Sequence, residues 1–165
     1  WMNGHLLRAL DNYLALPLIL IEDASTRGRR PRYGYLGDFR KKSHGGFEYR
    51  TLPSWLASPA ITQGVFTLAA LIVNNYWRLS RKPLQEWDVQ AAYYSGDKRR
   101  LQDEVAKLWK DLEQLTGYEV HAASLESLRR QITTMQSWNE QADIRPAWKI
   151  APGVRKEAFD EEIML

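Results

Sequence analysis

Cysteine is absent from the 165 residues of this chain, and only three residues are histidine. Without cysteine there are no disulfide bonds and no thiolate metal ligands, which fits a reducing compartment, so we expect a cytoplasmic protein. His5 and His44 have no partner at the spacing of metal ligands. No stretch reaches about 18 apolar residues, and no signal peptide is recognisable, so we expect no membrane span.

Several catalytic signatures are also missing. The chain contains no G-x-S-x-G motif, no Walker-type G-x-x-x-x-G-K-[ST] loop and no dinucleotide fingerprint. These absences disfavour a serine hydrolase, a P-loop nucleotide hydrolase and a Rossmann-type oxidoreductase.

What the chain does contain is typical of a folded globular domain. Hydrophobic residues make up 44% and charged residues 26%, and seven tryptophans and eight tyrosines can supply a core. Trp1 and Met2 stand inside an already helical pattern, so we expect a fragment of one domain that lacks its N-terminal part. We divide residues 1–165 into 1–56 (helix, basic loop and site strand), 57–140 (helical part) and 141–165 (extended tail).

Periodicity and breakers predict the elements. Apolar residues at three- and four-residue spacing predict a helix over residues 1–16, which Pro17 is expected to end. Residues 18–23 fit either a buried strand or the end of a buried helix. A glycine-rich loop over 24–38 precedes a strand over 46–52. Further helices are expected from Pro59, with Ser58 as the N-cap, to about 81, and then at 84–94, 98–116 and 124–140.

Positive charge is concentrated in one segment. Residues 23–50 hold eight Lys/Arg against three acids, so this segment carries +5 in a chain whose net charge is +3, and the remainder carries −2. A single basic segment on a nearly neutral chain favours an anionic ligand over a general nucleic-acid surface.

Glu48 and Arg50 stand two apart on the predicted strand and therefore share one face. A carboxylate there can bind Mg²⁺ and an arginine beside it can hold a phosphate. The same pattern is equally typical of a solvent-facing ladder of charges across two strands.

The arginines of the preceding loop have the same two interpretations. They suit phosphates or a substrate carboxylate, and they also suit a solvated loop. Glu22 and Asp23 are expected to pair with these arginines, and Asp11 is expected on the surface of the first helix or at a cap.

An ordered series of short matches gives the nucleotide interpretation more weight. Across Leu10 to Leu56 the chain resembles the distal part of a phage-type carboxylate–amine (COOH–NH2) ligase, a family of the glutamine synthetase and glutamate–cysteine ligase superfamily. The matching pieces are Leu10–Asp11, Leu16–Pro17, an acid and an arginine pair before Tyr33–Gly34, then Gly37, Phe39–Arg40, Gly46 and Glu48–Tyr49–Arg50–Thr51–Leu52.

This resemblance implies an α+β fold, part of an antiparallel-sheet funnel with a mainly helical C-terminal portion. It implies ATP and Mg²⁺ (or Mn²⁺), and a carboxylate that is phosphorylated before an amine displaces the phosphate. Substrates would be small-molecule or peptide carboxylates and amines, and the missing N-terminal half, or another chain, would complete the site. By the same resemblance Glu48 is the metal ligand, Arg50 and Arg40 are catalytic, Arg50, Arg30, Arg32 and Lys42 bind the cofactor, and Tyr33 and Arg27 contact substrate.

Two alternatives remain. Loop 27–42, with aromatic residues among its cations, fits a nucleic-acid-binding module, although the acid at Glu48 makes nucleic acid the weaker expectation. The helices over 98–116 and 124–140 also fit a phage structural or interaction protein, unless they pack on their own domain.

Overall fold

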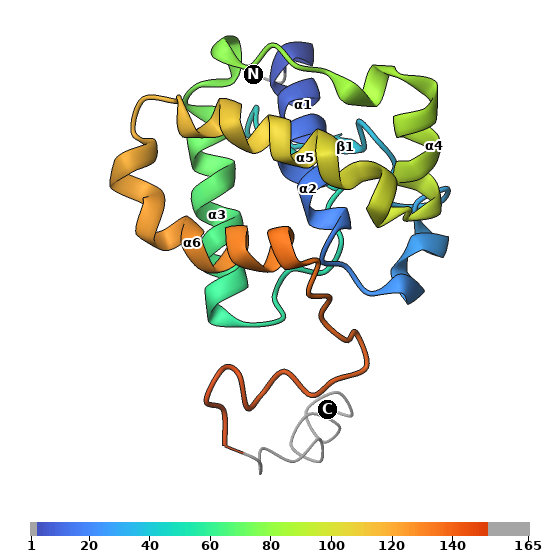
Figure 1. Ribbon diagram of the computed structural model, residues 1–165, viewed down its shortest axis with the longest axis vertical. Helices are drawn as coiled ribbons and strands as arrows, with labels where there is room; N and C mark the ends of the chain where they lie inside the picture. Colours follow the sequence, from blue (N-terminus) through green and yellow to red (C-terminus); the bar gives the residue numbers. More distant parts are fainter. Residues whose placement is uncertain (1–2, 152–165) are drawn as a thin grey trace.

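The computed structural model describes residues 3–151, and these form an α+β fold that is mostly helical with one small antiparallel sheet. The helices are α1 (Gly4–Leu10), α2 (Leu16–Ile19), α3 (Pro59–Val73), α4 (Trp87–Ser95), α5 (Lys98–Glu113) and α6 (Tyr118–Thr134), with short turns η1 (Asp11–Ala15), η2 (Ala24–Arg29), η3 (Tyr76–Arg78) and η4 (Pro83–Gln85). In Figure 1 α5 crosses in front of α1 and α2, with α3 and α6 to one side and α4 to the other.

The first helix runs through Pro17 instead of ending there, so that prediction was wrong. Between α1 and α2, η1 is a π-helical turn in which the Leu16 N–H bonds to the carbonyl of Asp11, five residues back. Proline lacks an N–H and its ring clashes with the carbonyl four residues earlier in a regular α-helix. The extra residue of the π-turn makes room for that ring, and α1, η1 and α2 form one continuous helix.

This continuous helix is the centre of the core. Residues from Tyr13 to Ile21 are almost fully buried, so the helix is covered on all sides. Leu18 and Ile19 lie in its last turn, which confirms the helix-end interpretation of that apolar run over the strand.

The later helices pack their apolar faces on this same domain. A Cβ at Gly64 of α3 would lie 2.6 Å from the Leu128 Cβ of α6, so these two helices approach very closely. Ser58 caps α3 as predicted, but α3 ends at Val73 and α6 begins earlier than expected, at Tyr118. The interaction-protein interpretation gains no support, because the apolar residues of α5 and α6 are buried: Leu101, Val105, Leu108 and Leu112, and Leu125, Leu128 and Ile132.

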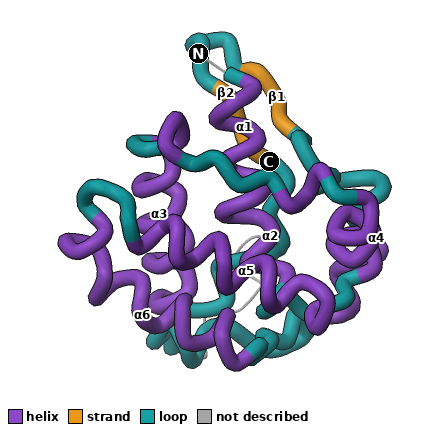
Figure 2. Tube along the Cα trace, turned by 45° about the horizontal axis from the view of Figure 1, so that its top comes forward, coloured by secondary structure: helices purple, strands orange, loops and turns teal. Residues whose placement is uncertain are grey.

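The two strands form a hairpin that packs on α1 (Figure 2). β1 (Phe39–Lys41) pairs antiparallel with β2 (Phe47–Tyr49), and Arg40 lies opposite Glu48. Within residues 3–151 this hairpin is the whole sheet, so the described part of the chain does not contain the larger sheet that the resemblance implies.

After α6 the chain crosses the base of the domain as a tail without regular helix or strand up to residue 151. The Trp138 N–H donates to the Ile21 carbonyl at 3.1 Å, and the Trp148 indole donates to the Leu56 carbonyl at 2.8 Å. Up to residue 151 the tail consists of turns and irregular chain, and the remainder of the tail expected over 141–165 lies outside the described residues. No helix in the described part of the chain has the length and apolar character needed to cross a bilayer.

Candidate functional site

Four charged side chains gather on the outer face of the hairpin, and Glu48 is at their centre. The Arg40 Nη2 donates to Glu48 Oε2 at 2.7 Å, and the Lys42 ammonium contacts the same oxygen. Arg50 Nε lies 4.0 Å from the other carboxylate oxygen. Hydrogen bonds from Lys42 and Arg40 lower the pKa of Glu48 to about 2, so this carboxylate is charged at any physiological pH.

The backbone explains why these side chains meet. Antiparallel register sets Arg40 directly across from Glu48, and the turn over residues 42–46 brings Lys42 to the same side. Gly45 adopts a φ of +85° within this turn, which a side chain would disfavour. The cluster carries three cations and one acid, so it retains positive charge for an anion even with Glu48 paired.

Arg50 connects this cluster to the loop before the hairpin. Its guanidinium carbon lies 4.4 Å from the centre of the Tyr33 ring, and its Nη1 lies 3.7 Å from the Asp38 carboxylate. The contact with Tyr33 and the charge of Asp38 raise the pKa of Arg50. Arg29 lies 5.6 Å from the same ring and donates to the carbonyls of Thr51 and Leu52. Tyr33 is therefore held between two arginines at the edge of the cluster.

Arg30 is turned away from this face. It is 1% exposed, its Nη1 donates to the Glu22 carboxylate at 2.6 Å, and its Nε donates to the Tyr93 carbonyl at 3.1 Å. The expected pairing of Glu22 with a loop arginine is thus confirmed. The predicted contact of Arg30 with a cofactor stays a prediction, and the geometry favours a structural role.

The remaining predicted residues lie on the surface, outside the cluster. Arg27 and Arg32 are exposed, and no hydrogen bond or ion pair among residues 3–151 joins either of them to Glu48. Asp23 accepts from Ser25 and Glu140 backbone N–H groups instead of pairing with an arginine. The structure therefore brings together Glu48, Arg50, Arg40, Lys42 and Tyr33, and leaves Arg27, Arg30 and Arg32 apart.

Asp11 was expected on the helix surface or at a cap. It stands at the C-cap position of α1, but it is 8% exposed beneath the hairpin, so the surface expectation was wrong. The Tyr49 hydroxyl donates to Asp11 Oδ1 at 2.7 Å. Burial raises the pKa of Asp11 to about 6, although the bond from Tyr49 opposes the shift. The one sequence signal for this position is an acid inside an otherwise apolar helix.

Tyr49 and Glu48 are neighbours on β2, so they point to opposite faces of the strand. The Asp11–Tyr49 bond fixes the inner face of β2 on the central helix, and this presents Glu48 on the outer face. Asp11 thus supports the site without belonging to it.

Glu48 supplies one hard oxygen ligand, and no cluster of three His, Asp or Glu side chains that could hold a metal ion occurs within residues 3–151. Mg²⁺ in nucleotide sites is commonly held by one or two carboxylates together with phosphate oxygens. The donor set of the hairpin fits that arrangement as one protein ligand beside cations that can hold the phosphates.

Comparison with known families gives one match. The family model described as "Phage phiEco32-like COOH.NH2 ligase-type 2" matches residues 2–150, which is nearly the entire chain. No curated protein and no solved structure matches the chain.

Proposed function

The chain belongs to the phage phiEco32-like COOH-NH2 ligase family, type 2, and from this premise we propose that it serves the ATP-dependent joining of a carboxylate to an amine. The first step moves the γ-phosphoryl group of ATP to a carboxylate oxygen and gives an acyl phosphate and ADP. In the second step the amine nitrogen attacks the acyl carbon, phosphate leaves with the bonding electron pair, and the nitrogen loses a proton to give the amide.

The observation that carries this proposal is the outer face of the hairpin. One carboxylate surrounded by Arg40, Lys42 and Arg50 is the arrangement that phosphoryl transfer requires, because the transferred group is strongly negative. A solvent-facing charge ladder would give the same pairs, so the two interpretations are separated by the activity test below.

The residues take the following roles in the proposal. Arg50, fixed by Tyr33 and Asp38, is placed to hold the transferring phosphoryl group from one side, and Arg40 from the other. Lys42 neutralises the neighbouring phosphates. Glu48 would hold Mg²⁺, which shields the triphosphate when it is bound. Phosphates that draw Arg40 and Lys42 away from Glu48 would free its oxygens for this purpose.

The finer features of the family remain part of the proposal. We propose that the hairpin joins a larger antiparallel sheet of the glutamine synthetase type, with strands and metal ligands that residues 3–151 do not supply. Tyr33 would line the acceptor side, where Arg50 already contacts its ring. The alternative of a nucleic-acid module on loop 27–42 gains no specific support, because Arg29 and Arg30 point inward.

The test is phosphate release from Mg-ATP by the full chain with pools of amino acids and peptides. We expect release that needs an added amine and that falls at least about a hundredfold in Glu48→Gln and Arg50→Ala. Arg145→Ala is the matched control, since Arg145 pairs only with Asp143 of the tail among the described residues. Turnover retained in both site variants would refute the assignment of the hairpin.

A further inference from the structure

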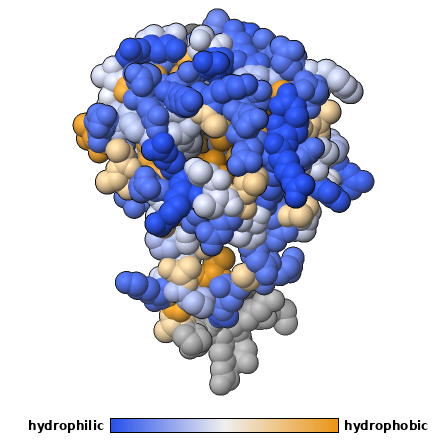
Figure 3. Space-filling view, in the orientation of Figure 1, coloured by the Kyte–Doolittle hydropathy of each residue, from blue (hydrophilic) through white to orange (hydrophobic). Residues whose placement is uncertain are grey.

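A cavity separate from the hairpin lies between the tail and the base of the helical body. One wall is the loop Ser54 to Ala57, and the other is the tail from Trp138 to Ile144. Its volume is about 420 Å³, which is within the range of small-molecule sites. Figure 3 shows apolar surface where the tail meets the body. No hairpin residue lines this cavity.

Both walls are fixed to the core of the domain. The Thr62 hydroxyl donates to the Trp55 carbonyl at 3.2 Å, and the Trp55 ring packs edge-on against Phe66 at 4.9 Å. On the other wall the Glu140 N–H donates to Asp23 at 3.0 Å. The Trp148 indole links the tail to the first wall through its bond to the Leu56 carbonyl. The cavity is therefore bounded by specific contacts on each side.

The lining has the chemistry of a cation site. Glu140 carries the one charge among the lining side chains. The other lining residues are two tryptophans, four aliphatic residues and the polar Ser54 and Asn139. The Trp138 indole donates to Glu140 Oε1 at 2.9 Å, and no hydrogen bond within residues 3–151 reaches the second oxygen. That oxygen is free to accept from a ligand.

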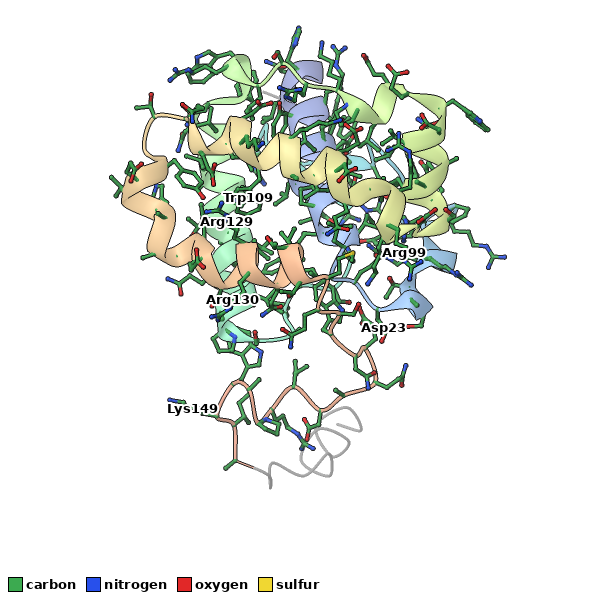
Figure 4. The ribbon with its side chains drawn as sticks, viewed as in Figure 1. Asp23, Arg99, Trp109, Arg129, Arg130 and Lys149 are labelled. Carbon is green, nitrogen blue, oxygen red and sulfur yellow. The ribbon has the colours of Figure 1, made fainter. Side chains whose placement is uncertain are left out.

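The charges beside the cavity include two carboxylates and the ammonium of Lys98, which already donates to the Glu22 carbonyl and to Ser137. Asp23, which lies at the base of the body in Figure 4, accepts the backbone N–H of Glu140 and so adds a second carboxylate next to this residue. Lys149, a cation of the tail, points outward in the same view. An anion at this position would meet carboxylates and indole faces, whereas an ammonium would gain from both.

We infer that this cavity binds a primary ammonium group on an aliphatic stem, with the nitrogen at Glu140 and the stem between Trp55 and Trp138. The ligand is a free alkylamine or the side chain of a lysine, since both have this chemistry. The inference does not depend on the proposed ligase activity, and it assigns no catalytic role to Glu140.

The test uses the indole N–H signals of the ¹⁵N-labelled full chain, titrated with n-butylammonium. We expect shifts at Trp55 and Trp138 and none at Trp109, whose indole donates to Tyr118 within the helical body (Figure 4). Trp77, which is 68% exposed elsewhere on the surface, is the internal control for non-specific contact with the amine. n-Butanol, of the same shape without charge, should bind about tenfold more weakly.

Glu140→Gln keeps the acceptor for the Trp138 indole and removes the charge. We expect about a tenfold loss of butylammonium affinity and unchanged butanol binding in this variant. Preferential binding of Nα-acetyl-lysine amide would identify a protein lysine as the source, and preferential binding of butylammonium a free amine. Equal binding of butanol and butylammonium to the unmodified chain, or no effect of Glu140→Gln, would overturn the inference.

Discussion

At the scale of single residues, the arginines of the basic segment fall into a buried group and an exposed group, and residue type alone does not distinguish them. Arg30 is enclosed with Glu22 and Tyr93, whereas Arg40 and Arg50 face the outside of the hairpin. Charge counting indicates that the segment suits an anion, but it could not say which arginine had an acid inside the core to pair with. That choice depends on where the helices place Glu22 and Tyr93, which are 71 residues apart by their numbers and adjacent only in the fold.

Asp11 gives the clearest prediction of pH dependence. Its pKa is about 6 in the folded protein against 3.8 as the ordinary value, so the folded state holds the proton more tightly between these two pH values. The contribution of Asp11 to stability is therefore present at pH 4 and is lost as the pH rises through 6, by about 3 kcal/mol in total.

Asparagine at this position cannot titrate but can still accept from Tyr49. We expect urea unfolding between pH 4 and pH 7.5 to show a larger loss of stability in the unmodified chain than in Asp11→Asn, by about 2–3 kcal/mol. The comparison between the two chains cancels the titration of the other acids. Parallel stability curves for the two would show that Asp11 is not buried as described.

At the scale of elements, most helices followed from periodicity, and the errors were at their ends. Ser58 and Pro59 carry a local signal for the start of α3, which is why this boundary was correct. The continuation through Pro17 had no local signal, because a π-turn is stabilised by the packing of residues on every side of the central helix. The opposite faces of Glu48 and Tyr49 were predicted correctly, since alternation is a local property. The strand itself is shorter than the predicted 46–52, because β2 spans only Phe47–Tyr49, and Leu52 packs on the core instead of sharing the face of Glu48.

The close crossing of α3 and α6 provides a prediction at this scale. A Cβ on Gly64 would lie 2.6 Å from the Cβ of Leu128, and neither atom can move without its backbone. We expect Gly64→Ala to destabilise the protein by about 1–3 kcal/mol despite the better helix propensity of alanine. Gly4→Ala is the matched control in α1, where a Cβ meets no atom within 4 Å. Thermal unfolding that shifts equally in both variants would argue against a close crossing.

At the scale of the whole molecule, the site and its support come from different parts of the chain. The hairpin presents Glu48, the central helix holds the hairpin from below through Asp11, and the helices α3 to α6 enclose the central helix. The sequence could place the site strand because its residues are contiguous. It could not predict the support by Asp11 or the cavity under the tail, because both bring together residues distant along the chain.

The tail is the part of the molecule whose attachment can be tested most directly. It is held by a few hydrogen bonds, to Ile21, Asp23 and Leu56 and from Lys98 to Ser137, and by the packing of Trp138 on the core, whereas the helices are held by a continuous core. Trp148→Phe removes the indole N–H that donates to Leu56 and keeps an aromatic ring. We expect trypsin to cleave this variant after Lys149 about three to ten times faster, because local opening of the tail costs less when one of its bonds is lost. Arg145 precedes Pro146 and is therefore not a tryptic site.

Mass spectrometry of the fragments against time measures these rates. The helical body should show unchanged thermal unfolding, since the bond lies outside the core, and Trp77→Phe should leave the cleavage rates as they are. Equal rates in the Trp148 variant and the unmodified chain would mean that this bond does not hold the tail. The cavity wall from Trp138 to Ile144 would then depend on the bonds to Ile21 and Asp23, on the contact of Lys98 with Ser137 and on the packing of Trp138 on the core.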